Sequence, residues 1–200
     1  MNLALIQATD HDLVALAASG SEKAYRELLD RYQRPVFSLI YRMVRDRERA
    51  EDLAQETFVK VFNHIGSFNP KYKFSSWIFK IASNLTIDAI RKKDLETVSL
   101  DGSRNASTQD EIDATRITVE SRDENPEEFL EAKELGQEIE RAIGELRPEY
   151  RTAILLRHVE GRPYEEIAEI MGIPLGTVKT YIHRARGELR ETLAHLRINT

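Results

Sequence analysis

The chain has 200 residues, no cysteine, and 34 acidic against 29 basic side chains, so its formal net charge is −5. The absence of cysteine excludes disulfides and thiolate metal sites and favours a reducing compartment such as the cytoplasm. No apolar run approaches the roughly 18 residues of a membrane span, and the N-terminus lacks the basic leader of a signal peptide, so we expect a cytoplasmic protein with no direct membrane insertion.

The acidity is concentrated in one segment. Residues 97–140 carry 4 Lys and Arg against 13 Asp and Glu, whereas residues 1–96 carry 15 against 13 and residues 141–200 carry 10 against 8. Both flanks are therefore mildly basic, and the negative net charge of the whole chain does not exclude a nucleic-acid partner.

The first part of the chain predicts amphipathic helices, because glycine and proline are scarce and stand between periodic segments. Asp10 and Ser21 are candidate N-caps, and Gly20 is expected to close a first short helix. Two longer helices are expected over residues 22–44 and 47–65. The residues expected to face inward are Ala24, Leu28, Leu29, Tyr32, Val36, Leu39 and Ile40, then Ala50, Leu53, Ala54, Thr57, Phe58, Val61, Phe62 and Ile65.

The opposite face of the 47–65 helix is mostly polar. It presents Asp52, Gln55, Glu56 and Val59. A single amphipathic helix ordinarily has a solvated face of this kind, so the pattern alone assigns no function.

Residues 68–93 interleave aromatic and basic side chains. Aromatic rings stack on unpaired bases while cations follow the backbone, the combination that single-stranded DNA binding requires. A loop before a helix can also hold an extruded base. We expect Phe74 and Trp77 to lie in the core, and the loop at 66–73 with Lys80 and Asn84 to be the better functional candidates. The aromatic residues are Phe68, Tyr72, Phe74, Trp77 and Phe79, and the cations are Lys71, Lys73, Lys80 and a cluster expected to end the helix, Arg91, Lys92 and Lys93.

Residues 97–125 are typical of a flexible acidic linker, since they are rich in Ser, Thr, Asp, Glu and Asn and lack an apolar period. Structureless loops of this length are uncommon within one domain. Asn125 as N-cap and Pro126 at the first helical position then restart a helix. The prediction is an all-α protein with two small helical domains, at 8–96 and 126–197.

Residues 164–186 have the pattern of a helix-turn-helix. A first helix is expected over 164–171, ended by Gly172, where a left-handed backbone is easiest without a side chain. Pro174 is expected at the first position of a second helix. Ala168 lies where two crossing helices require a small residue. The residues of the second helix expected to face the core are Val178, Ile182, Ala185, Leu189 and Leu193.

The outward face of that second helix carries hydroxyls and long cations. Arginine forms paired hydrogen bonds with guanine and lysine neutralises phosphates, so the face suits the major groove of duplex DNA. A solvated basic face on a structural helix is the plainer interpretation, but the core pattern and the polar pattern agree on DNA binding. The candidate DNA-contacting residues are Thr177, Lys179, Thr180, Tyr181, His183, Arg184 and Arg186.

Four motifs occur in series: AYRELLDRY, AEDLAQETFVKVF, FSSWIFKIASNLTIDAIRKK and YEEIAEIMGIPLGTVKTYIHRARGEL. Together they resemble region 2 and region 4 of a bacterial RNA polymerase sigma factor. The chain is most similar to the small extracytoplasmic-function (ECF) group, which has only those two domains and a linker. The resemblance covers most of the chain outside residues 1–9 and 97–125.

The resemblance implies a role for each motif. Region 2 at 8–96 would bind core polymerase through Asp52, Gln55 and Glu56, which would meet the clamp coiled coil of the largest subunit. It would also recognise and melt the −10 promoter element. Region 4 at 126–197 would read the −35 element through the outward face of its second helix and dock near the polymerase flap. The residues expected at the −10 element are Lys71, Lys73, Lys80, Asn84, Arg91 and Lys92.

Further expectations follow from the same resemblance. The acidic linker would thread the basic RNA-exit path of the polymerase and, without polymerase, compete with DNA phosphates. Promoter-specific initiation would serve a stress or envelope response. An anti-sigma factor commonly restrains a member of this group, in some cases at the membrane. Pro163 departs from the group, because a Ser or Thr usually caps that helix.

Two other classes of protein fit the sequence less well. A conventional repressor or response-regulator effector shares this kind of recognition helix, but it would need a sensing domain and a dimer interface, and the N-terminal half has neither an α/β alternation nor a heptad seam. An enzyme is disfavoured, because the five histidines are scattered and neither a glycine-rich phosphate loop nor a metal-spaced cluster occurs. We therefore predict no catalytic residue, metal or cofactor.

Overall fold

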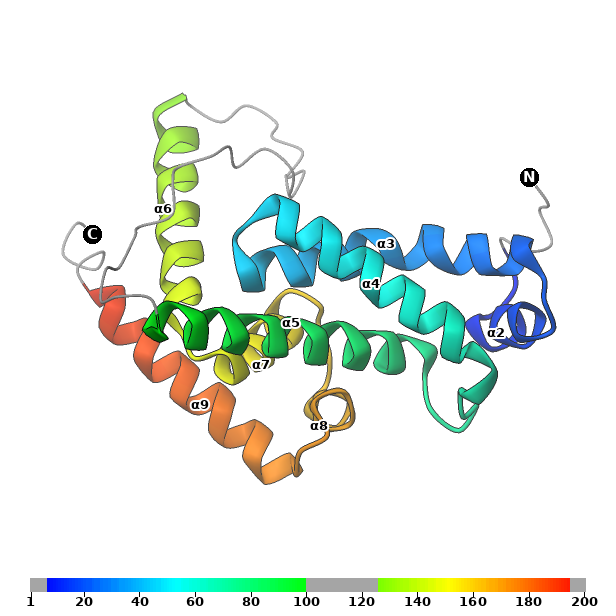
Figure 1. The fold of residues 1–200 in the computed structure, drawn as a ribbon. Coiled ribbons are helices and arrows are strands. Elements are labelled where there is room, and N and C mark those ends of the chain that lie inside the picture. The colour runs from blue at the N-terminus through cyan, green and yellow to red at the C-terminus, as the bar shows by residue number, and fades with distance from the viewer. Residues whose placement is uncertain (1–6, 100–125, 195–200) are drawn as a thin grey trace.

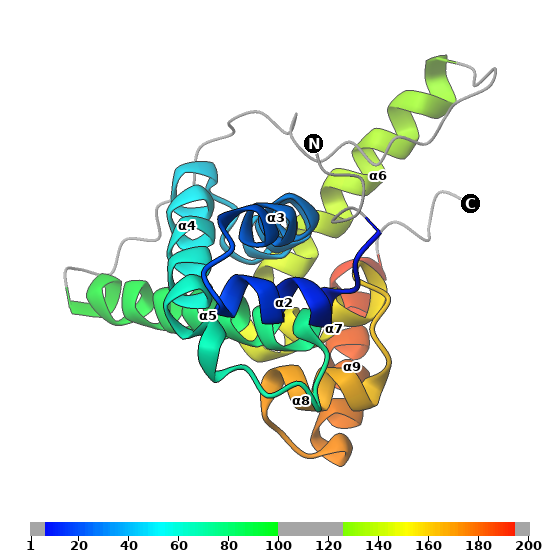
Figure 2. The ribbon, with the colours of Figure 1, turned by 90° about the vertical axis from the view of Figure 1, so that its right-hand side faces the viewer.

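The computed structural model describes residues 7–99 and 126–194, and over these ranges the chain is helical without β-strands (Figures 1 and 2). The first half has α2 (Asp10–Ala18), α3 (Glu22–Val44), α4 (Arg47–His64), the 3₁₀ turn η1 (Ile65–Ser67) and α5 (Phe74–Ser99). The second half has α6 (Pro126–Glu145), α7 (Pro148–His158), α8 (Tyr164–Met171) and α9 (Leu175–Thr192). None of the described helices is long and apolar enough to cross a membrane.

The caps of the first helices agree only partly with expectation. Ser21 caps α3 as predicted, and Gly20 at φ +96° turns the chain between α2 and α3. The cap of α2 was predicted wrongly: Thr9 is the N-cap, in a reciprocal capping box with Asp12. Asp10 is instead the first helical residue, and its carboxylate accepts hydrogen bonds from the Tyr32 hydroxyl and from Arg31.

The first half has its own apolar core between α2, α3, α4 and α5. It includes Leu28, Val36, Leu53 and Ile78, all buried as helical spacing requires. Phe62 was expected to face this core and does not, since 55% of it is exposed. Its ring lies edge-on to Tyr25 at the margin of α4, where nothing in the described chain covers its outer side.

The two halves share a second apolar core. Leu39 and Met43 of α3 and Phe79 of α5 are fully buried against residues of α7, α8 and α9. Burying one such side chain stabilises a fold by about 1.5–3 kcal/mol. The helices that were expected in separate domains are therefore packed directly on each other, with α8 beside the N-terminal part of α5 (Figures 1 and 2).

A half-buried arginine reinforces this contact. The Arg151 guanidinium of α7 donates to the carbonyls of Ile143 at 3.1 Å and Leu146 at 2.9 Å, and also to those of Gly144 and Met43. Carbonyls at the ends of α6 and α3 have no partner within their own helices, so one cation satisfies acceptors from both halves. Hydrogen bonds from Arg151 therefore also connect the two halves at the edge of the shared core.

A truncation in the shared core tests whether the halves unfold together. We expect Phe79→Ala to lower the free energy of unfolding by about 3–5 kcal/mol, because a large buried ring leaves a cavity. Leu135→Ala, at an exposed position of α6, is the control and is expected to change it by less than about 0.5 kcal/mol. Urea unfolding followed by circular dichroism measures both; a separate transition for each half would contradict the shared core.

Candidate nucleic-acid and partner interfaces

The helix-turn-helix predicted at residues 164–186 forms, and its first helix has the expected bounds. Helix α8 begins after Pro163, which supplies no side-chain cap, and ends at Gly172 in the left-handed conformation at φ +65°. The Ile173 amide then donates to the Ala168 carbonyl at 3.1 Å, which closes the turn. Pro174 was expected to be the first helical residue of α9, but it is the N-cap. The helix therefore begins one residue later than expected, at Leu175.

One face of α9 is buried and the opposite face is open. Val178, Ile182 and Ala185 pack in the shared core as predicted. Five of the candidate DNA-contacting side chains are exposed: Lys179, Thr180, His183, Arg184 and Arg186. Thr177 and Tyr181 are half-buried, and the Tyr181 ring lies 5.1 Å from that of Tyr150, so its contact surface is smaller than the pattern predicted.

Residues of α7 support the cations of α9, a feature that helical spacing alone did not indicate. The Tyr150 hydroxyl accepts a hydrogen bond from Arg184 at 3.1 Å, and this bond raises the pKa of that guanidinium. Burial, with the charges of Arg186 and Arg157, lowers the pKa of His158, so its neutral ring can accept from Arg186 at 3.1 Å. Side chains of α7 therefore orient both arginines of α9.

The second candidate surface combines the loop at 66–73 with α5. The loop is folded back on itself, because the Asn69 side chain accepts from the Lys71 amide at 3.0 Å. Phe74 is buried as expected, Trp77 is half-buried, and Phe79 lies in the shared core. Tyr72 is the aromatic residue most open to solvent here, with 54% of it exposed. The exposed polar candidates are Lys71, Lys73, Lys80, Asn84, Arg91 and Lys92.

The basic cluster does not end α5, contrary to expectation. The helix continues beyond Lys93 to Ser99 and thus enters the segment predicted as linker. Residues such as leucine and glutamate favour helix, and neither glycine nor proline intervenes before residue 99. The rest of the predicted linker, residues 100–125, lies outside the described residues.

Glu166 of α8 links the helix-turn-helix to the loop at 66–73, and the sequence patterns did not predict this. It is 6% exposed, and its carboxylate accepts from Lys73 at 3.0 Å and from Arg162 at 2.8 Å. Burial alone would raise its pKa, but the Lys73 hydrogen bond and the Arg162 charge outweigh burial and hold the pKa below its ordinary value. Glu166 is therefore ionised at neutral pH.

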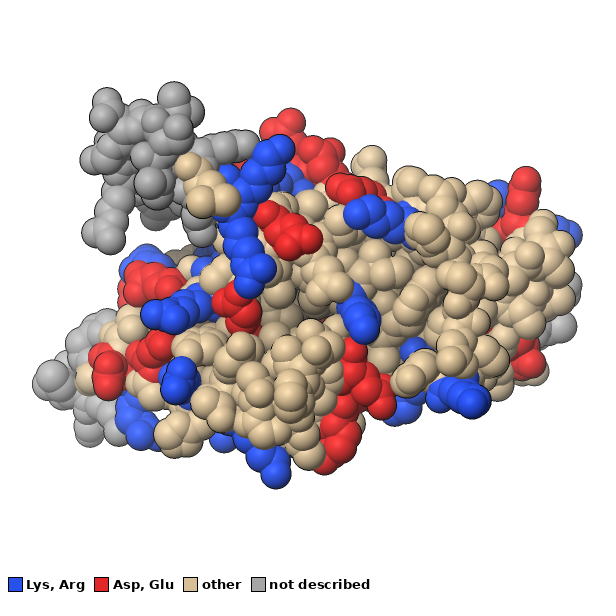
Figure 3. Space-filling model, turned by 60° about the horizontal axis from the view of Figure 1, so that its bottom comes forward, with Lys and Arg blue, Asp and Glu red and all other residues tan. Residues whose placement is uncertain are grey.

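The face that carries α5, α8 and α9 is not uniformly basic. Figure 3 shows Lys and Arg alternating there with Asp and Glu. Carboxylates next to these cations reduce the attraction for DNA phosphates. The isolated surface is therefore electrostatically mixed.

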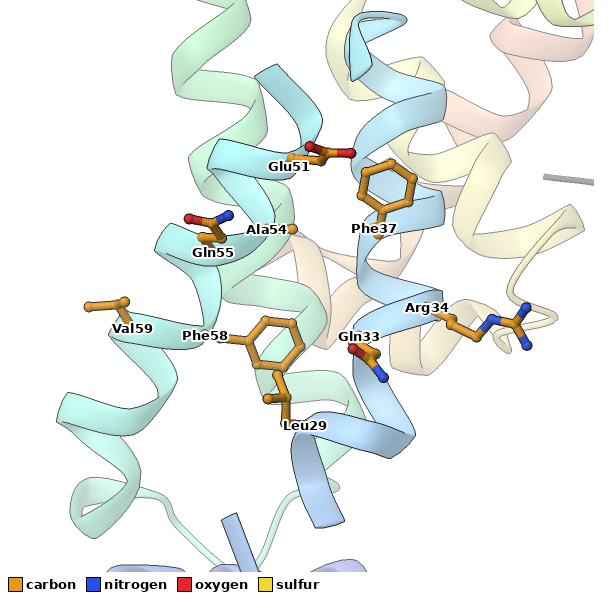
Figure 4. A pocket seen from close by; sticks show the side chains of 9 residues that line it. All are labelled: Leu29, Gln33, Arg34, Phe37, Glu51, Ala54, Gln55, Phe58 and Val59. Atoms are coloured by element: carbon orange, nitrogen blue, oxygen red, sulfur yellow. The ribbon is translucent and has the colours of Figure 1, made fainter. Parts of the chain in front are cut away.

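A third surface is a groove of about 620 Å³ between α3 and α4. Leu29, Phe37 and Phe58 form its apolar lining, and Figure 4 shows these side chains between the two helices. Gln55 and Val59 lie on the α4 side, and Val59 is 57% exposed. Apolar residues rimmed by polar ones are typical of protein–protein interfaces.

The predicted polymerase-binding residues, Asp52, Gln55 and Glu56, are all exposed. Of the three, Gln55 lines the groove. Asp52 and Glu56 lie on α4 but are not among the residues that line the groove, and Glu56 pairs with Lys60 at 3.2 Å. The contribution of α3 was missed because periodicity identifies a helix face without saying which helix lies beside it. Within the described ranges, no three His, Asp or Glu side chains form a group that could hold a metal ion.

A helix-turn-helix with an exposed basic helix face is characteristic of a DNA-binding protein. Residues 28–96 match the family description Sigma-70 region 2, and residues 136–189 match Sigma-70, region 4. The ECF RNA polymerase sigma factor SigW of Bacillus subtilis is 37% identical over 180 residues, covering 88% of this chain and 92% of that protein. The ECF RNA polymerase sigma-E factor of Escherichia coli is 33% identical over 187 residues, covering 90% and 92%.

Two solved structures share the fold. CnrH, in complex with the cytosolic domain of CnrY, superposes with a TM-score of 0.65 at 22% identity, covering 93% of this chain and 97% of that one. The sigma factor RpoE of Bartonella quintana, in complex with the anti-sigma factor NepR, gives 0.63 at 23% identity, covering 86% and 98%. The chain belongs to the ECF sigma factors of bacterial RNA polymerase. Proteins of this family are non-catalytic factors for transcription initiation.

The buried carboxylate gives a pH-dependent prediction. Because the folded-state pKa of Glu166 is below its ordinary value of 4.5, its ionisation stabilises the fold above that pH, and the effect is lost as pH falls through the folded-state pKa. We expect Glu166→Gln to lower the free energy of unfolding by about 1–3 kcal/mol at pH 7 and by progressively less below pH 4.5.

Glu165→Gln, at an exposed position of the same helix, is the matched control, expected within about 0.5 kcal/mol of wild type at both pH values. Urea unfolding at neutral and acid pH measures the difference. An effect of Glu166→Gln that is equally large in acid would refute the assigned ionisation.

Proposed function

We propose that this chain binds core RNA polymerase through the α3–α4 groove and directs it to promoters that it reads with α5 and α9. The observation that carries the proposal is the coexistence in one chain of three distinct surfaces: an apolar groove with a polar rim, and two surfaces on α5 and α9 whose exposed cations stand among carboxylates. The chain belongs to the ECF sigma factors, and this supports the proposal that the groove binds polymerase and that the other two surfaces bind promoter DNA. Asp52, Gln55 and Glu56 are the polymerase-binding residues.

The two DNA surfaces have different ligands in this proposal. The loop at 66–73 and α5 bind the unpaired −10 strand, with Asn84 near an extruded base. Helix α9 enters the major groove at the −35 element. The −10 residues are Lys71, Lys73, Lys80, Asn84, Arg91 and Lys92, and the −35 residues are Thr177, Lys179, Thr180, Tyr181, His183, Arg184 and Arg186.

In this proposal, region 2 comprises residues 8–96 and region 4 comprises residues 126–197. Residues 97–125 form the acidic connection, which follows the basic RNA-exit path of the polymerase while region 4 docks near the flap. Two weak DNA contacts held at promoter spacing by one polymerase then act as one strong contact.

An anti-sigma factor is the proposed regulator, in the setting of a stress or envelope response. The support is indirect: the structures that share this fold were solved with CnrY and with the anti-sigma factor NepR. A membrane-bound anti-sigma factor would place this cytoplasmic chain at the membrane without inserting it.

The decisive experiment is run-off transcription with bacterial core polymerase on a pooled genomic promoter library, with and without the protein. We expect discrete new start sites that depend on it, and their upstream sequences to share two elements. Binding of the protein alone to duplex operators, without any initiation, would support a conventional repressor and overturn the proposal.

Arg184→Ala tests the −35 assignment. A paired hydrogen bond to a base contributes about 1–3 kcal/mol of discrimination, so the variant holoenzyme should lose that much preference for the −35 sequence. Competition binding with base-substituted promoters measures it. Arg190→Ala, exposed on the same helix but outside the proposed contact set, is the control. An unchanged sequence preference in the Arg184 variant would show that the assignment is wrong.

Asp52→Lys tests the polymerase assignment. Reversing a charge on α4 one helical turn from Gln55, which lines the groove, should weaken binding to core polymerase by about tenfold or more. Glu48→Lys, exposed in the first turn of the same helix, makes the same charge change outside the proposed contact set. Fluorescence anisotropy of labelled protein titrated with core enzyme measures both; equal affinities would place the polymerase contact elsewhere.

A further inference from the structure

Two arginines on the open face of α9 are bound by side chains of another helix. Arg184 donates from Nη1 to the Tyr150 hydroxyl, and Arg186 donates from Nη2 to Nε2 of His158, both at 3.1 Å. Tyr150 stands in the first turn of α7, and His158 is the last residue of that helix. An exposed arginine has many rotamers, so each bond restricts a side chain that would otherwise be mobile.

The acceptor of Arg184 is fixed by the core. Tyr150 is buried, and its ring belongs to the shared apolar core. The ring of Tyr181, another candidate −35 residue, packs against it. Because a hydroxyl on a buried ring has little freedom to move, the packing of the core determines the direction in which Arg184 extends.

The acceptor of Arg186 is a neutral imidazole. The charged groups that face His158 are Arg186 of α9 and Arg157 of α7, and together with burial they lower the pKa of the ring. Arg157 itself lies over the Tyr164 ring of α8, 5.2 Å from its centre. A neutral imidazole has one ring nitrogen without a proton, and this nitrogen can accept from a guanidinium.

The bonds to α7 still leave donors for DNA. An arginine carries more N–H donors than a paired contact with guanine uses. Arg184 gives one donor to Tyr150 and Arg186 gives one to His158. Each guanidinium is therefore oriented by the protein and remains able to bind a base or a phosphate.

This ordering is selective among the candidate −35 side chains. Within the described part of the chain, Lys179 and His183 have no hydrogen-bond or ion-pair partner. The Thr180 hydroxyl donates only to the carbonyl of Gly176 in its own helix, at 2.9 Å. The support from α7 thus reaches the two arginines, the side chains best suited to paired recognition of a base.

We propose that Tyr150 and His158 are positioning residues for reading the −35 element. Each holds one arginine of α9 in the orientation in which its side chain meets the DNA. Ordering the arginine beforehand removes part of the entropy cost of binding, and it disfavours the orientations that other base sequences would require. The inference rests on the proposed function, and it adds to it two determinants of promoter preference that lie outside the helix-turn-helix.

Tyr150→Phe tests the first position, because it removes the hydroxyl and keeps the ring against Tyr181. Competition binding of the holoenzyme with base-substituted promoters measures the preference for the −35 sequence. We expect this preference to fall by about two- to tenfold, the cost of ordering one mobile side chain on binding. Tyr164→Phe is the control: its hydroxyl makes no hydrogen bond to the described residues, and we expect an unchanged preference. An unchanged preference in Tyr150→Phe would overturn the inference.

Two substitutions of His158 separate the acceptor from the ring. Leucine has no acceptor, whereas glutamine keeps one in its side-chain carbonyl, and neither has an imidazole. We expect His158→Leu to lose about two- to tenfold of the −35 preference and His158→Gln to retain most of it. A role in packing alone would change both variants alike, so equal preferences in the two would overturn the assignment at His158.

A double-mutant cycle shows whether Tyr150 acts through Arg184. Tyr150→Phe should have no further effect on the −35 preference once Arg184→Ala is present, and independent losses that add would overturn the inference. Circular dichroism verifies that each variant is folded. If Arg184→Ala changes the preference and Tyr150→Phe does not, the inference alone fails. If Arg184→Ala itself changes nothing, the −35 assignment of the proposed function fails and the inference with it, so the two failures are distinguishable.

Discussion

The packing of Leu39, Met43 and Phe79 against the second half is the contact on which the rest of the arrangement depends. It places α8 on α5, and with it Glu166 beside Lys73 and Arg162 over the ring of Phe79. The apolar contact supplies most of the stability, since partly exposed ion pairs contribute little. The ion pairs determine instead which charges the free protein presents.

The three candidate surfaces are affected differently by this packing. The α3–α4 groove and the outward face of α9 remain open. The α5 surface is partly covered by the other half.

Sequence patterns predicted the features that depend on neighbouring residues. The boundaries of α3 and α8 were confirmed, because helical periodicity, the Ser21 cap and the Gly172 turn are local. The exposure of Phe62 was not predictable, since spacing groups residues on one face without saying what covers that face. The pairing of Arg91 with Glu149 joins residues 58 apart in the chain, and only the tertiary packing brings them together.

The central claim is that the two halves of the chain form one folded unit around the shared core. Hydrogen exchange at the amides of α8 and of the first turns of α5, in the wild-type protein and in Phe79→Ala, tests it most directly. The account predicts slow exchange in both helices of the wild-type protein and faster exchange in both helices of the variant. Faster exchange in α5 with unchanged exchange in α8 would contradict the account, because the two halves would then not be packed on each other.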